Sequence, residues 1–322
     1  MNSFRKENFE HKYTRRKNHH DYQAPCQYHI ILKKNPDFPN WGEVAGDPDI
    51  EDKKNGGAYI EKSLLGRLID RHIYNYPNKF NFIKIQQYIV MPDHAHVYLQ
   101  VLERMPKKLS YYITGLKGEI ARDYSEKTGK KFLPLDIFQE NFTDKIIYLG
   151  LNFSKIIFYI KDNPRRLAYR KKYPKWFERK DIIIDGVVYE GYGNHFLMDN
   201  PFKLVVRGHL RNTPEENSAL VQASLEHVDS GGVLVSPFIH PAENEAMLQA
   251  RLRGGKIIRI QNKPFKERYK PGETEFYECT KGNLLILAPK EKNFDDDFRK
   301  ACKQMNALSE RIVAIDHINS QA

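Results

Sequence analysis

The apolar pattern of the chain changes near residue 195, and this change predicts two domains with different sheets. After residue 195, short apolar runs alternate with segments of helical periodicity. Strands are expected at residues 203–207, 232–236, 256–261 and 283–288, and helices at 214–228, 241–253 and 294–315. Such alternation is typical of a mainly parallel sheet with helices packed on it, an α/β Rossmann-like architecture. With 322 residues, the chain has room for two domains.

The first part of the chain follows a different order, in which a helix precedes two adjacent strands. The expected elements are a strand at 28–32, a loop at 35–57, a helix at 58–76, strands at 80–91 and 96–102, a helix at 109–124, a mixed loop and strand at 130–147, and a helix at 155–169 capped by Ser154. Pro77-Asn78 is expected to stop the first helix, and Pro92-Asp93 indicates a hairpin.

We therefore predict four segments: a disordered basic N-terminus at 1–20, a first domain at 21–180, a linking hairpin at 181–194 and a second domain at 195–322. No apolar run approaches the roughly 20 residues that span a bilayer, and the polar start lacks the apolar region of a secretory signal. The three cysteines are widely spaced and odd in number, which does not indicate a disulfide framework. A reducing, cytoplasmic setting without membrane contact is expected.

The positive charge of the protein is concentrated in its first part. Residues 1–180 contain 34 Lys+Arg and 21 Asp+Glu, a balance of +13, whereas residues 181–322 contain 18 and 20, a balance of −2. A basic face attracts polyanions, although many basic domains are simply soluble. Aromatic side chains are interleaved with the basic residues of 165–180, which suits contact with single strands; a solvated helix end with a linker is the alternative. The candidate DNA contacts are Lys117, Arg122, Arg165, Arg166 and Arg170.

The histidines at positions 94 and 96 are the strongest local signal for chemistry. Side chains alternate between the two faces of a strand, so His94 and His96 are expected on the same face. Two parallel imidazoles can ligate a divalent metal ion. The alternative is a pair of surface histidines without a ligand. The apolar residues on both sides favour the metal site, because they place the pair in a buried central strand.

A second signal lies in the segment 158–164. On a helix, Tyr159 and Asn163 are four residues apart and lie on one face. A phenol that attacks phosphorus and an amide oxygen that ligates a metal could then share one site. The alternative is that Tyr159 is a core tyrosine. Pro164 disfavours helical geometry at Asn163, so we expect the helix to kink or end there.

These motifs together resemble the REP-associated tyrosine transposases and their one-tyrosine HUH relatives, over residues 22–175. No single piece is specific, but the ordered set is. It comprises Asp21-Tyr22, Pro25, Tyr28, Val90–His96, Leu109-Ser110, Leu116-Lys117, Phe138–Phe142, Asp144, Ile146-Ile147, Tyr159-Ile160 and Asn163-Pro164.

The resemblance implies an α+β, ferredoxin-like domain whose antiparallel sheet carries the metal-binding His94 and His96. It further implies that Tyr159 is the nucleophile, that Asn163 is a third ligand and that the ion is Mg²⁺ or Mn²⁺. The implied activity is cleavage and rejoining of single-stranded, hairpin-containing DNA through a 5′-phosphotyrosine. Both monomers and homodimers occur among the relatives, so the oligomeric state stays open.

Two features depart from the resemblance. Relatives commonly carry a His and an Arg in the stretch that corresponds to residues 144–148, where this chain has Lys145 and Tyr148. Phosphate binding would then be weaker, or would fall to Arg165 and Arg166. The short transposases also lack a second domain. A protein adopted by its host, with altered activity, is therefore a second interpretation.

In the second domain, five residues are candidates for a ligand pocket: Arg207, Gly231, Gly232, Ser236 and Glu243. Loops at the ends of strands in open α/β sheets commonly bind ligands, and a Gly-Gly pair admits a phosphate closely. The segments around 231–243, 254–258 and 282–289 resemble the Rossmann-like superfamily of the DNA-processing protein of transformation and the cytokinin-activating proteins. The resemblance implies a nucleotide or single-stranded DNA ligand. The alternative is a Gly-Gly turn in an ordinary α/β domain.

Three functional hypotheses follow from the sequence. The first is a strand-transferring or nicking enzyme that acts on hairpin-bearing single strands. The second is a DNA-binding protein that has kept the fold and reduced its catalysis. The third is a nucleotide-sensing α/β protein that its N-terminal part targets to DNA.

Overall fold

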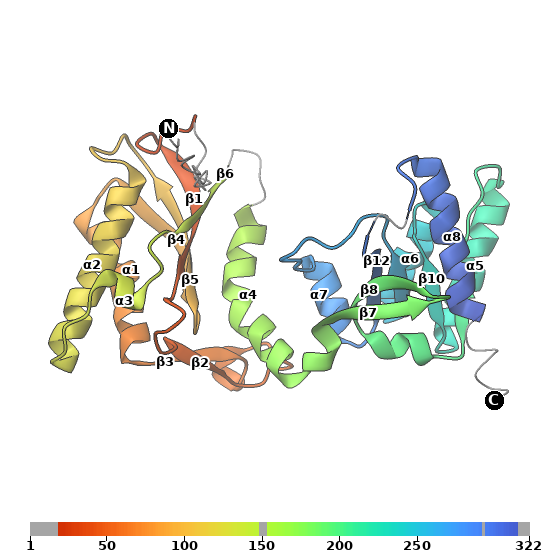
Figure 1. The fold of residues 1–322 in the computed structure, drawn as a ribbon, viewed down its shortest axis with the longest axis horizontal. Coiled ribbons are helices and arrows are strands. Elements are labelled where there is room, and N and C mark those ends of the chain that lie inside the picture. Colours follow the sequence, from red (N-terminus) through yellow and green to blue (C-terminus); the bar gives the residue numbers. More distant parts are fainter. Residues whose placement is uncertain (1–18, 148–152, 292–293, 315–322) are drawn as a thin grey trace, which may run out of the picture. The chain divides into compact units, whose positions relative to one another are not determined.

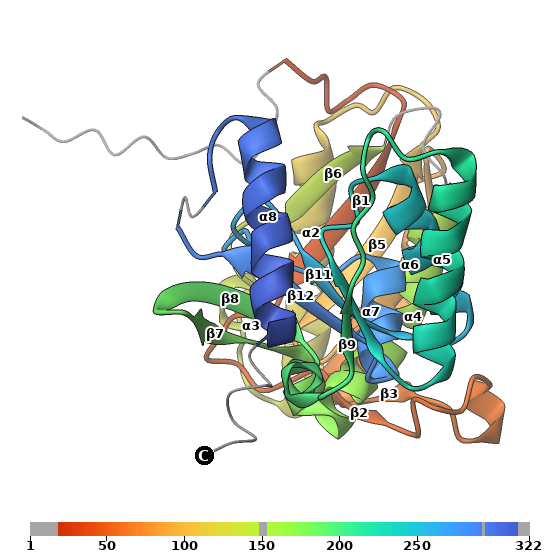
Figure 2. The same ribbon diagram turned by 90° about the vertical axis from the view of Figure 1, so that its right-hand side faces the viewer.

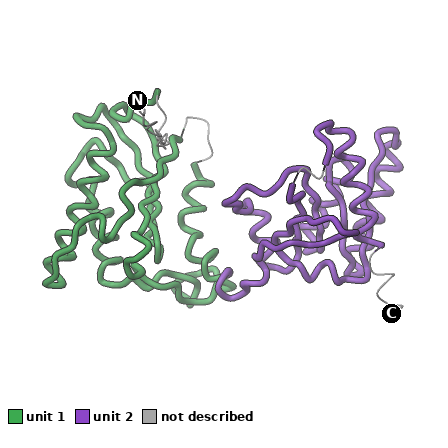
Figure 3. Tube along the Cα trace, viewed as in Figure 1, with its two compact units in different colours: residues 1–168 green, residues 169–322 purple. Residues whose placement is uncertain are grey.

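The computed structural model describes residues 19–147, 153–291 and 294–314. The chain forms two compact units, residues 1–168 and 169–322 (Figure 3). The predicted disordered N-terminus falls almost entirely outside the described residues, as does Tyr148. Among the helices that the structure describes, none is long and apolar enough to cross a membrane.

The first unit is built on an antiparallel sheet of four strands in the order β4-β5-β1-β6 (Figure 1). Its elements, in chain order, are β1 (Cys26–Lys33), β2 (Gly42–Ala45), β3 (Tyr59–Lys62), α1 (Leu64–Lys79), β4 (Ile83–Val90), β5 (His94–Val101), α2 (Leu109–Thr128), α3 (Pro134–Ile137), β6 (Thr143–Ile147) and α4 (Phe153–Lys172). The unit is thus α+β, as predicted.

The two faces of this sheet carry different side chains, because consecutive residues of a strand point to opposite faces. On one face, Ile30 and Val97 belong to the main hydrophobic core, which the apolar sides of α1 and α2 complete (Figure 1). On the opposite face lie His94 and His96 of β5, and next to them His29 of β1. The hydrophobic face therefore fixes the sheet, and the other face is left for polar chemistry.

Helix α4 covers the histidine face (Figure 1). Ile160 is fully buried and packs with Tyr98 of β5 and Ile147 of β6 in a small separate cluster. Ile89 and Tyr159 pack against the edge of this cluster. An apolar contact thus places one side of α4 directly over the strands that carry the imidazoles.

The first helix differs from the prediction at both ends. Residues 59–62 form β3, which pairs with β2, so the helix begins only after Ser63. Ser63 caps it: the hydroxyl oxygen accepts a hydrogen bond from the Gly66 amide at 3.1 Å. The helix also continues through Pro77, which the sequence interpretation treated as a stop. Local periodicity alone could not separate a short strand from the adjoining helix.

Of the two outcomes predicted at Pro164, a kink or an end of the helix, the end is wrong, because α4 runs on to Lys172. A proline inside a helix removes one backbone hydrogen bond. The Asn163 side-chain amide donates a hydrogen bond to the Tyr159 carbonyl at 2.6 Å and so adds a contact in the turn before the proline. Packing of the buried Ile160 and Ala168, on either side of the proline, favours the continuous helix.

The second unit contains a six-stranded mixed sheet in the order β7-β8-β12-β11-β10-β9, in which β9 to β12 are parallel. Its elements are β7 (Glu178–Ile184), β8 (Val187–Gly193), β9 (Lys203–Val205), α5 (Pro214–Asp229), β10 (Val233–Ser236), α6 (Pro241–Leu252), β11 (Lys256–Ile260), α7 (Glu273–Thr280), β12 (Leu284–Pro289) and α8 (Phe298–Ala314). The hairpin expected at 181–194 is β7-β8, and β8 pairs with β12, so it belongs to this sheet.

Alternation again gives this sheet two apolar faces. Val233 and Val235 of β10 pack with Leu308 of α8, whereas Leu234 packs with Val228 of α5 and with α6. Figure 2 shows α8 on one side of the parallel strands and α5 and α6 on the other. Helices on both faces agree with the predicted α/β layout; α7, within the segment between two predicted strands, was not anticipated.

Candidate functional site

Three histidines from two neighbouring strands form a hydrogen-bonded row. Nε2 of His94 lies 3.0 Å from Nε2 of His96, and Nδ1 of His96 lies 2.9 Å from Nε2 of His29. At the far end, Nδ1 of His94 lies 2.6 Å from a carboxylate oxygen of Asp93. His96, in the middle, is only 2% exposed. The row thus runs from a solvent-exposed carboxylate through the buried His96 to the partly buried His29.

The row has one consistent assignment of protons when all three imidazoles are neutral. The Asp93 carboxylate can only accept, so His94 donates from Nδ1 and presents the lone pair of Nε2. His96 then donates from Nε2 and accepts at Nδ1, where His29 donates its Nε2 proton. Asp93 thereby fixes the tautomer of His94 in which Nε2 can serve as a metal ligand.

His29 is a member of this site that the sequence analysis missed. Burial, together with the smaller effects of the nearby Lys145 and His94, lowers the pKa of His29 to about 4. A neutral imidazole at His29 agrees with its place in the row. The signal was present in the expected strand at 28–32, because alternation places His29 on the face opposite the apolar Tyr28 and Ile30.

Tyr159 reaches the same place from α4. Its ring centroid lies 5.5 Å from that of His96 and 6.3 Å from that of His29, in both cases edge to face. The guanidinium of Arg166, two turns further along the helix, lies 5.5 Å from the centre of the Tyr159 ring. The structure therefore brings together the phenol, two imidazoles and one cation that the sequence placed far apart.

Asn163 lies one helical turn from Tyr159, as predicted, but its described hydrogen bond is within the helix. Its amide nitrogen donates to the Tyr159 carbonyl. A carbonyl cannot donate, so this bond fixes which end of the amide is nitrogen and puts the Asn163 oxygen on the opposite side. Among the contacts of the described residues, none joins this oxygen to either Nε2 of the histidine pair, so Asn163 as a third ligand stays a prediction.

The spacing of the two imidazole nitrogens suits one small octahedral ion. Two adjacent ligands of such an ion, with bonds of about 2.1 Å, lie about 3.0 Å apart, which is the separation of Nε2 in His94 and His96. Within the described residues, no group of three or more His, Cys, Asp and Glu side chains could hold a metal. An ion held here would have two nitrogen ligands once the His96 proton had left Nε2, and an amide, water or phosphate oxygens would have to complete the shell.

The five predicted DNA contacts do not form one surface. Lys117 is 4% exposed and donates to the backbone carbonyls of Gln139 and Glu140, so its ammonium is committed inside the fold. Arg122 is exposed on α2, across the sheet from the histidines. Arg166 is 6% exposed and lies beside Tyr159, which fits a role within the site better than an outer phosphate contact.

The other two basic candidates lie at opposite ends of the second half of α4. Arg165 is half-buried, donates to the Pro48 carbonyl at 2.7 Å and lines a hollow described below. Arg170 lies in the second unit, where its guanidinium is 5.4 Å from the Phe276 ring centre. Among the candidates within the first unit, Arg165 and Arg166 are the ones on the side of the histidine face.

The ligand residues proposed for the second unit are not gathered in one place. Gly231 and Gly232 precede β10, whereas Ser236 ends it, so they lie at opposite edges of the sheet. The glycine pair forms the turn after α5. Gly231 has a left-handed φ of 84°, and a Cβ on Gly232 would come within 2.1 Å of the His227 ring. These glycines have a structural reason to be glycine.

Glu243 is a buried cap that joins two loops. It is 2% exposed and accepts hydrogen bonds from the amides of Gly208, Ile239 and His240, and from the Ser236 hydroxyl at 3.3 Å. Both carboxylate oxygens are thus used. Arg207 forms an ion pair with Glu310 at 2.7 Å, with both side chains partly exposed. These contacts account for Ser236, Glu243 and Arg207 without a ligand.

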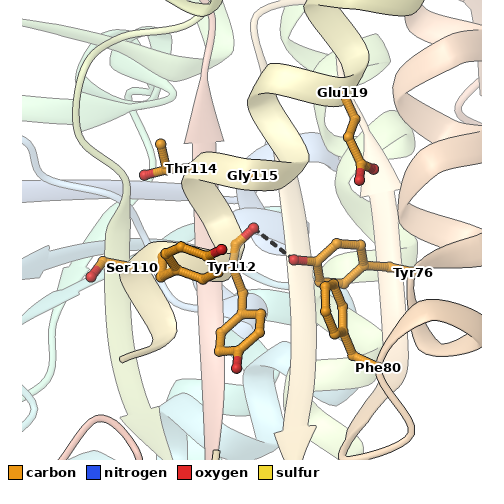
Figure 4. A pocket seen from close by; sticks show the side chains of 8 residues that line it. Tyr76, Phe80, Ser110, Tyr112, Thr114, Gly115 and Glu119 are labelled. Carbon is orange, nitrogen blue, oxygen red and sulfur yellow. Dashed lines mark hydrogen bonds between the residues drawn. The ribbon is translucent and has the colours of Figure 1, made fainter. Parts of the chain in front are cut away.

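A hollow of about 530 Å³ lies between α1 and α2, on the helical side of the first unit (Figure 4). Tyr76 and Phe80 form one wall and Tyr112 and Glu119 another, and the Tyr76 hydroxyl donates to the Tyr112 carbonyl at 2.6 Å. The sheet separates this hollow from the histidines, so it is not part of the candidate site.

Replacing Glu243 by alanine should destabilise the second unit by on the order of 3 kcal/mol, because several buried donors lose their only carboxylate. Urea unfolding followed by circular dichroism would measure the loss. Glu245→Ala, on the exposed side of the same helix, is the matched control and should change stability by much less. Equal effects of the two substitutions would contradict the capping role.

Replacing His29 by alanine should weaken divalent metal binding by roughly 10- to 100-fold, because His96 loses the partner that orients its ring. Calorimetric titration of the full chain with Mn²⁺ would measure this. His72→Ala, on α1 at the other side of the sheet, is the control and should bind the ion like the parent protein. Unchanged affinity in His29→Ala would show that this hydrogen bond does not support the site.

The free energy of unfolding of the metal-free protein should fall as the pH is lowered from about 6.5 to about 4, by up to about 3 kcal/mol. In that range the unfolded chain binds a proton at His29 and the folded chain does not. Urea unfolding in chelator can be followed through the buried Trp41 after Trp176→Phe. His29→Gln should remove much of the slope; an identical slope in this variant would refute the assignment.

No family model matches the chain, and no curated protein matches it either. Among solved structures, a REP-associated tyrosine transposase bound to a REP hairpin matches 48% of this chain and 76% of its own, with 14% identity and a TM-score of 0.31. DNA processing protein A from Helicobacter pylori, described for its single-stranded DNA binding mode, matches 42% of this chain and 66% of its own, with 20% identity and a TM-score of 0.32. At these TM-scores, neither match establishes the fold or the function of this chain.

Proposed function

We propose that the protein is a metal-dependent enzyme that nicks and rejoins single-stranded DNA through Tyr159. The observation that carries the proposal is the meeting of His94, His96 and Tyr159 at one place, from a strand and a helix more than fifty residues apart. If Tyr159 served only to pack the hydrophobic core, there would be no need for a pair of imidazoles that face each other beside it. A surface histidine pair would not place its inner member at 2% exposure.

The topology of the first unit supports this proposal. Its main strands and helices follow the order β-α-β-β-α-β, from β1 through α1, β4, β5 and α2 to β6. This order is that of the ferredoxin-like architecture that the resemblance implies. In this arrangement His94 and His96 lie on the central strand β5. Helix α4 follows the last strand, β6, and packs on the sheet face that carries these histidines.

The proposed reaction is a transesterification that conserves the phosphodiester bond energy. The Tyr159 oxygen loses its proton and attacks the phosphorus. A new O–P bond forms, the bond from phosphorus to the 3′ oxygen breaks, and that oxygen takes a proton to become a free 3′-OH. The product is a 5′-phosphotyrosine, from which an incoming 3′-OH can reverse the steps, so no nucleotide cofactor is consumed.

The charges around Tyr159 have distinct tasks in this reaction. Arg166, whose guanidinium lies 5.5 Å from the centre of the Tyr159 ring, would balance the negative charge of the phenolate. His94 and His96 would hold Mg²⁺ or Mn²⁺, with the Asn163 oxygen as a third ligand after a side-chain rotation. A cation bound there would polarise the scissile phosphate as a Lewis acid. Asp93 holds His94 in its ligating tautomer. For His96 to ligate through Nε2, its proton would have to move to Nδ1, where Nε2 of His29 would accept it.

The substrate that we propose is a hairpin with a single-stranded flank, because the histidine face lies in the strongly basic part of the chain. We place the protein in the cytoplasm, where its three free cysteines would stay reduced. A homodimer and a nucleotide ligand in the second unit remain proposals without a supporting contact. The contacts of Glu243 and Gly232 favour a structural reading of that unit's candidates.

A DNA-binding protein with reduced catalysis is the second proposed function. Lys145, which pairs with His29 across β1 and β6, favours it, because a lysine stands in the stretch where relatives commonly carry His and Arg. Its charge faces the imidazole row and would oppose a cation there. The two proposals differ in one outcome, the formation of a covalent adduct.

Tyr159→Phe should abolish a covalent DNA adduct and leave DNA affinity within about twofold, because the lost hydroxyl takes part in bond formation and little else. The assay is incubation with a labelled hairpin oligonucleotide and Mn²⁺, followed by denaturing electrophoresis. His94→Ala and His96→Ala should also remove the adduct. Tyr111→Phe, an exposed tyrosine of α2, is the control and should form it normally.

Salt-sensitive binding without an adduct in the parent protein would favour the second proposed function. An adduct that persists in Tyr159→Phe, or in chelator, would contradict the first.

A further inference from the structure

A hollow of about 440 Å³ lies in the first unit between α4 and the segment that leads into β3. Two aromatic side chains line it, Tyr59 of β3 and Phe158 of α4. Four cations line it as well: Lys53, Lys62, Lys161 and Arg165. Nothing in the proposed reaction uses this hollow, yet its wall is formed by the same helix that carries the nucleophile.

The hollow adjoins the candidate active site on two sides. Ile89, which forms part of its wall, is paired directly with His96 across β4 and β5. Phe158 precedes Tyr159 in α4. At about 100° per residue, the side of α4 that carries Phe158, Lys161 and Arg165 lies about a third of a turn from the side that carries Tyr159. A ligand bound in the hollow would therefore lie beside the Tyr159 side chain without covering it.

The chemistry of the lining suits a nucleotide. Phe158 is 44% exposed, so its ring is open to a ligand. The Lys53 ammonium lies 5.5 Å from the centre of the Tyr59 ring. Aromatic faces stack with bases, and adjacent cations bind the phosphates that flank them. Arg165 is held in place by its bond to the Pro48 carbonyl.

Two carboxylates, Glu51 and Asp162, line the hollow beside the four cations, and Asp162 is 8% exposed. Glu51 is 88% exposed at its side chain and lies 3.7 Å from Arg165, a loose surface pair. Lys62 is paired with Asp70, whereas Lys53 and Lys161 are exposed lysines at the rim. A polyanion is accordingly attracted to the rim, and an apolar ring is accommodated inside.

We propose that this hollow receives the base of a nucleotide adjacent to the scissile phosphate. The inference rests on the proposed function, because a single strand drawn across the histidines would pass the hollow next. A volume of about 440 Å³ exceeds what one base requires and falls within the range of small-molecule sites. Unstacking the base and holding it against Phe158 would fix the register of the strand, so that one phosphate faces Tyr159.

The first test is the location of the bound strand. The probe is a DNA hairpin whose single-stranded thymidine flanks carry 5-iododeoxyuridine at one position at a time. The full chain is irradiated with each probe in chelator, which holds cleavage off, and the cross-linked peptides are mapped by mass spectrometry. We expect at least one position to cross-link to Tyr59 or Phe158. Cross-links confined to other segments would overturn the proposal.

The second test is affinity. Phe158→Ala should weaken binding of the unmodified probe about tenfold, as expected for loss of one stacked base. Phe158→Tyr, which keeps a ring, should restore it. Tyr74→Ala is the matched control, because Tyr74 is an exposed aromatic side chain of α1 across the sheet, and it should bind like the parent. Equal affinity of the parent and Phe158→Ala would overturn the proposal.

The outcomes separate this inference from the proposed function. An adduct at Tyr159 without cross-links in the hollow rejects the base pocket and leaves the enzyme standing. Cross-links at Phe158 without an adduct reject the enzyme and leave the hollow as a base-binding site of the second proposed function, a DNA-binding protein with reduced catalysis. A parent protein that binds none of the probes rejects both.

Discussion

The contact of Ile160 with Tyr98 and Ile147 is the interaction on which the proposed site depends. These three side chains hold α4 against the sheet face opposite the main core. Without this contact, Tyr159 would be a tyrosine on a helix with no fixed neighbour. With it, the phenol lies edge to face with His96 and His29. A small apolar cluster thus positions the polar groups, which could not hold the helix by themselves.

The hydrogen-bonded row from Asp93 to His29 joins side chains that differ in their exposure to solvent. Asp93 lies in the hairpin and is open to solvent, whereas His96 is enclosed beneath α4. An enclosed imidazole needs a hydrogen-bond partner for each ring nitrogen, and the strands supply His29 and His94. The same two contacts satisfy both nitrogens of the buried His96 ring. Binding of an ion at both Nε2 atoms would replace the hydrogen bond between His94 and His96 and would shift the His96 proton to Nδ1, toward His29.

Much of the fold could be predicted from the sequence, because alternation and helical periodicity report directly on burial. The hairpin around Pro92-Asp93, the shared face of His94 and His96, and the strand-helix alternation after residue 195 are examples. The stops expected at Pro77 and Pro164 were wrong, since packing of the surrounding turns outweighed the local preference of proline. The convergence of Tyr159 on the histidines was predictable only through the resemblance.

Side-chain partners were the part that the sequence could not provide. His29 joins the site through a diagonal contact between β1 and β5, which depends on strand order rather than on spacing along the chain. In the second unit, Ser236 and Glu243 have the residue types of a ligand site, but they bond to each other and to loop amides. Gly232 is required by the His227 ring, not by a phosphate. The types of these residues suggested a ligand site, whereas their contacts show that they already have partners within the protein.

The most direct measurement of the central claim is pulsed electron paramagnetic resonance of the full chain loaded with Mn²⁺. If one ion is shared by His94 and His96, the spectrum will show coupling to two imidazole nitrogens, and alanine at either position will leave coupling to one. A spectrum without imidazole coupling, or one that neither substitution changes, would contradict the account.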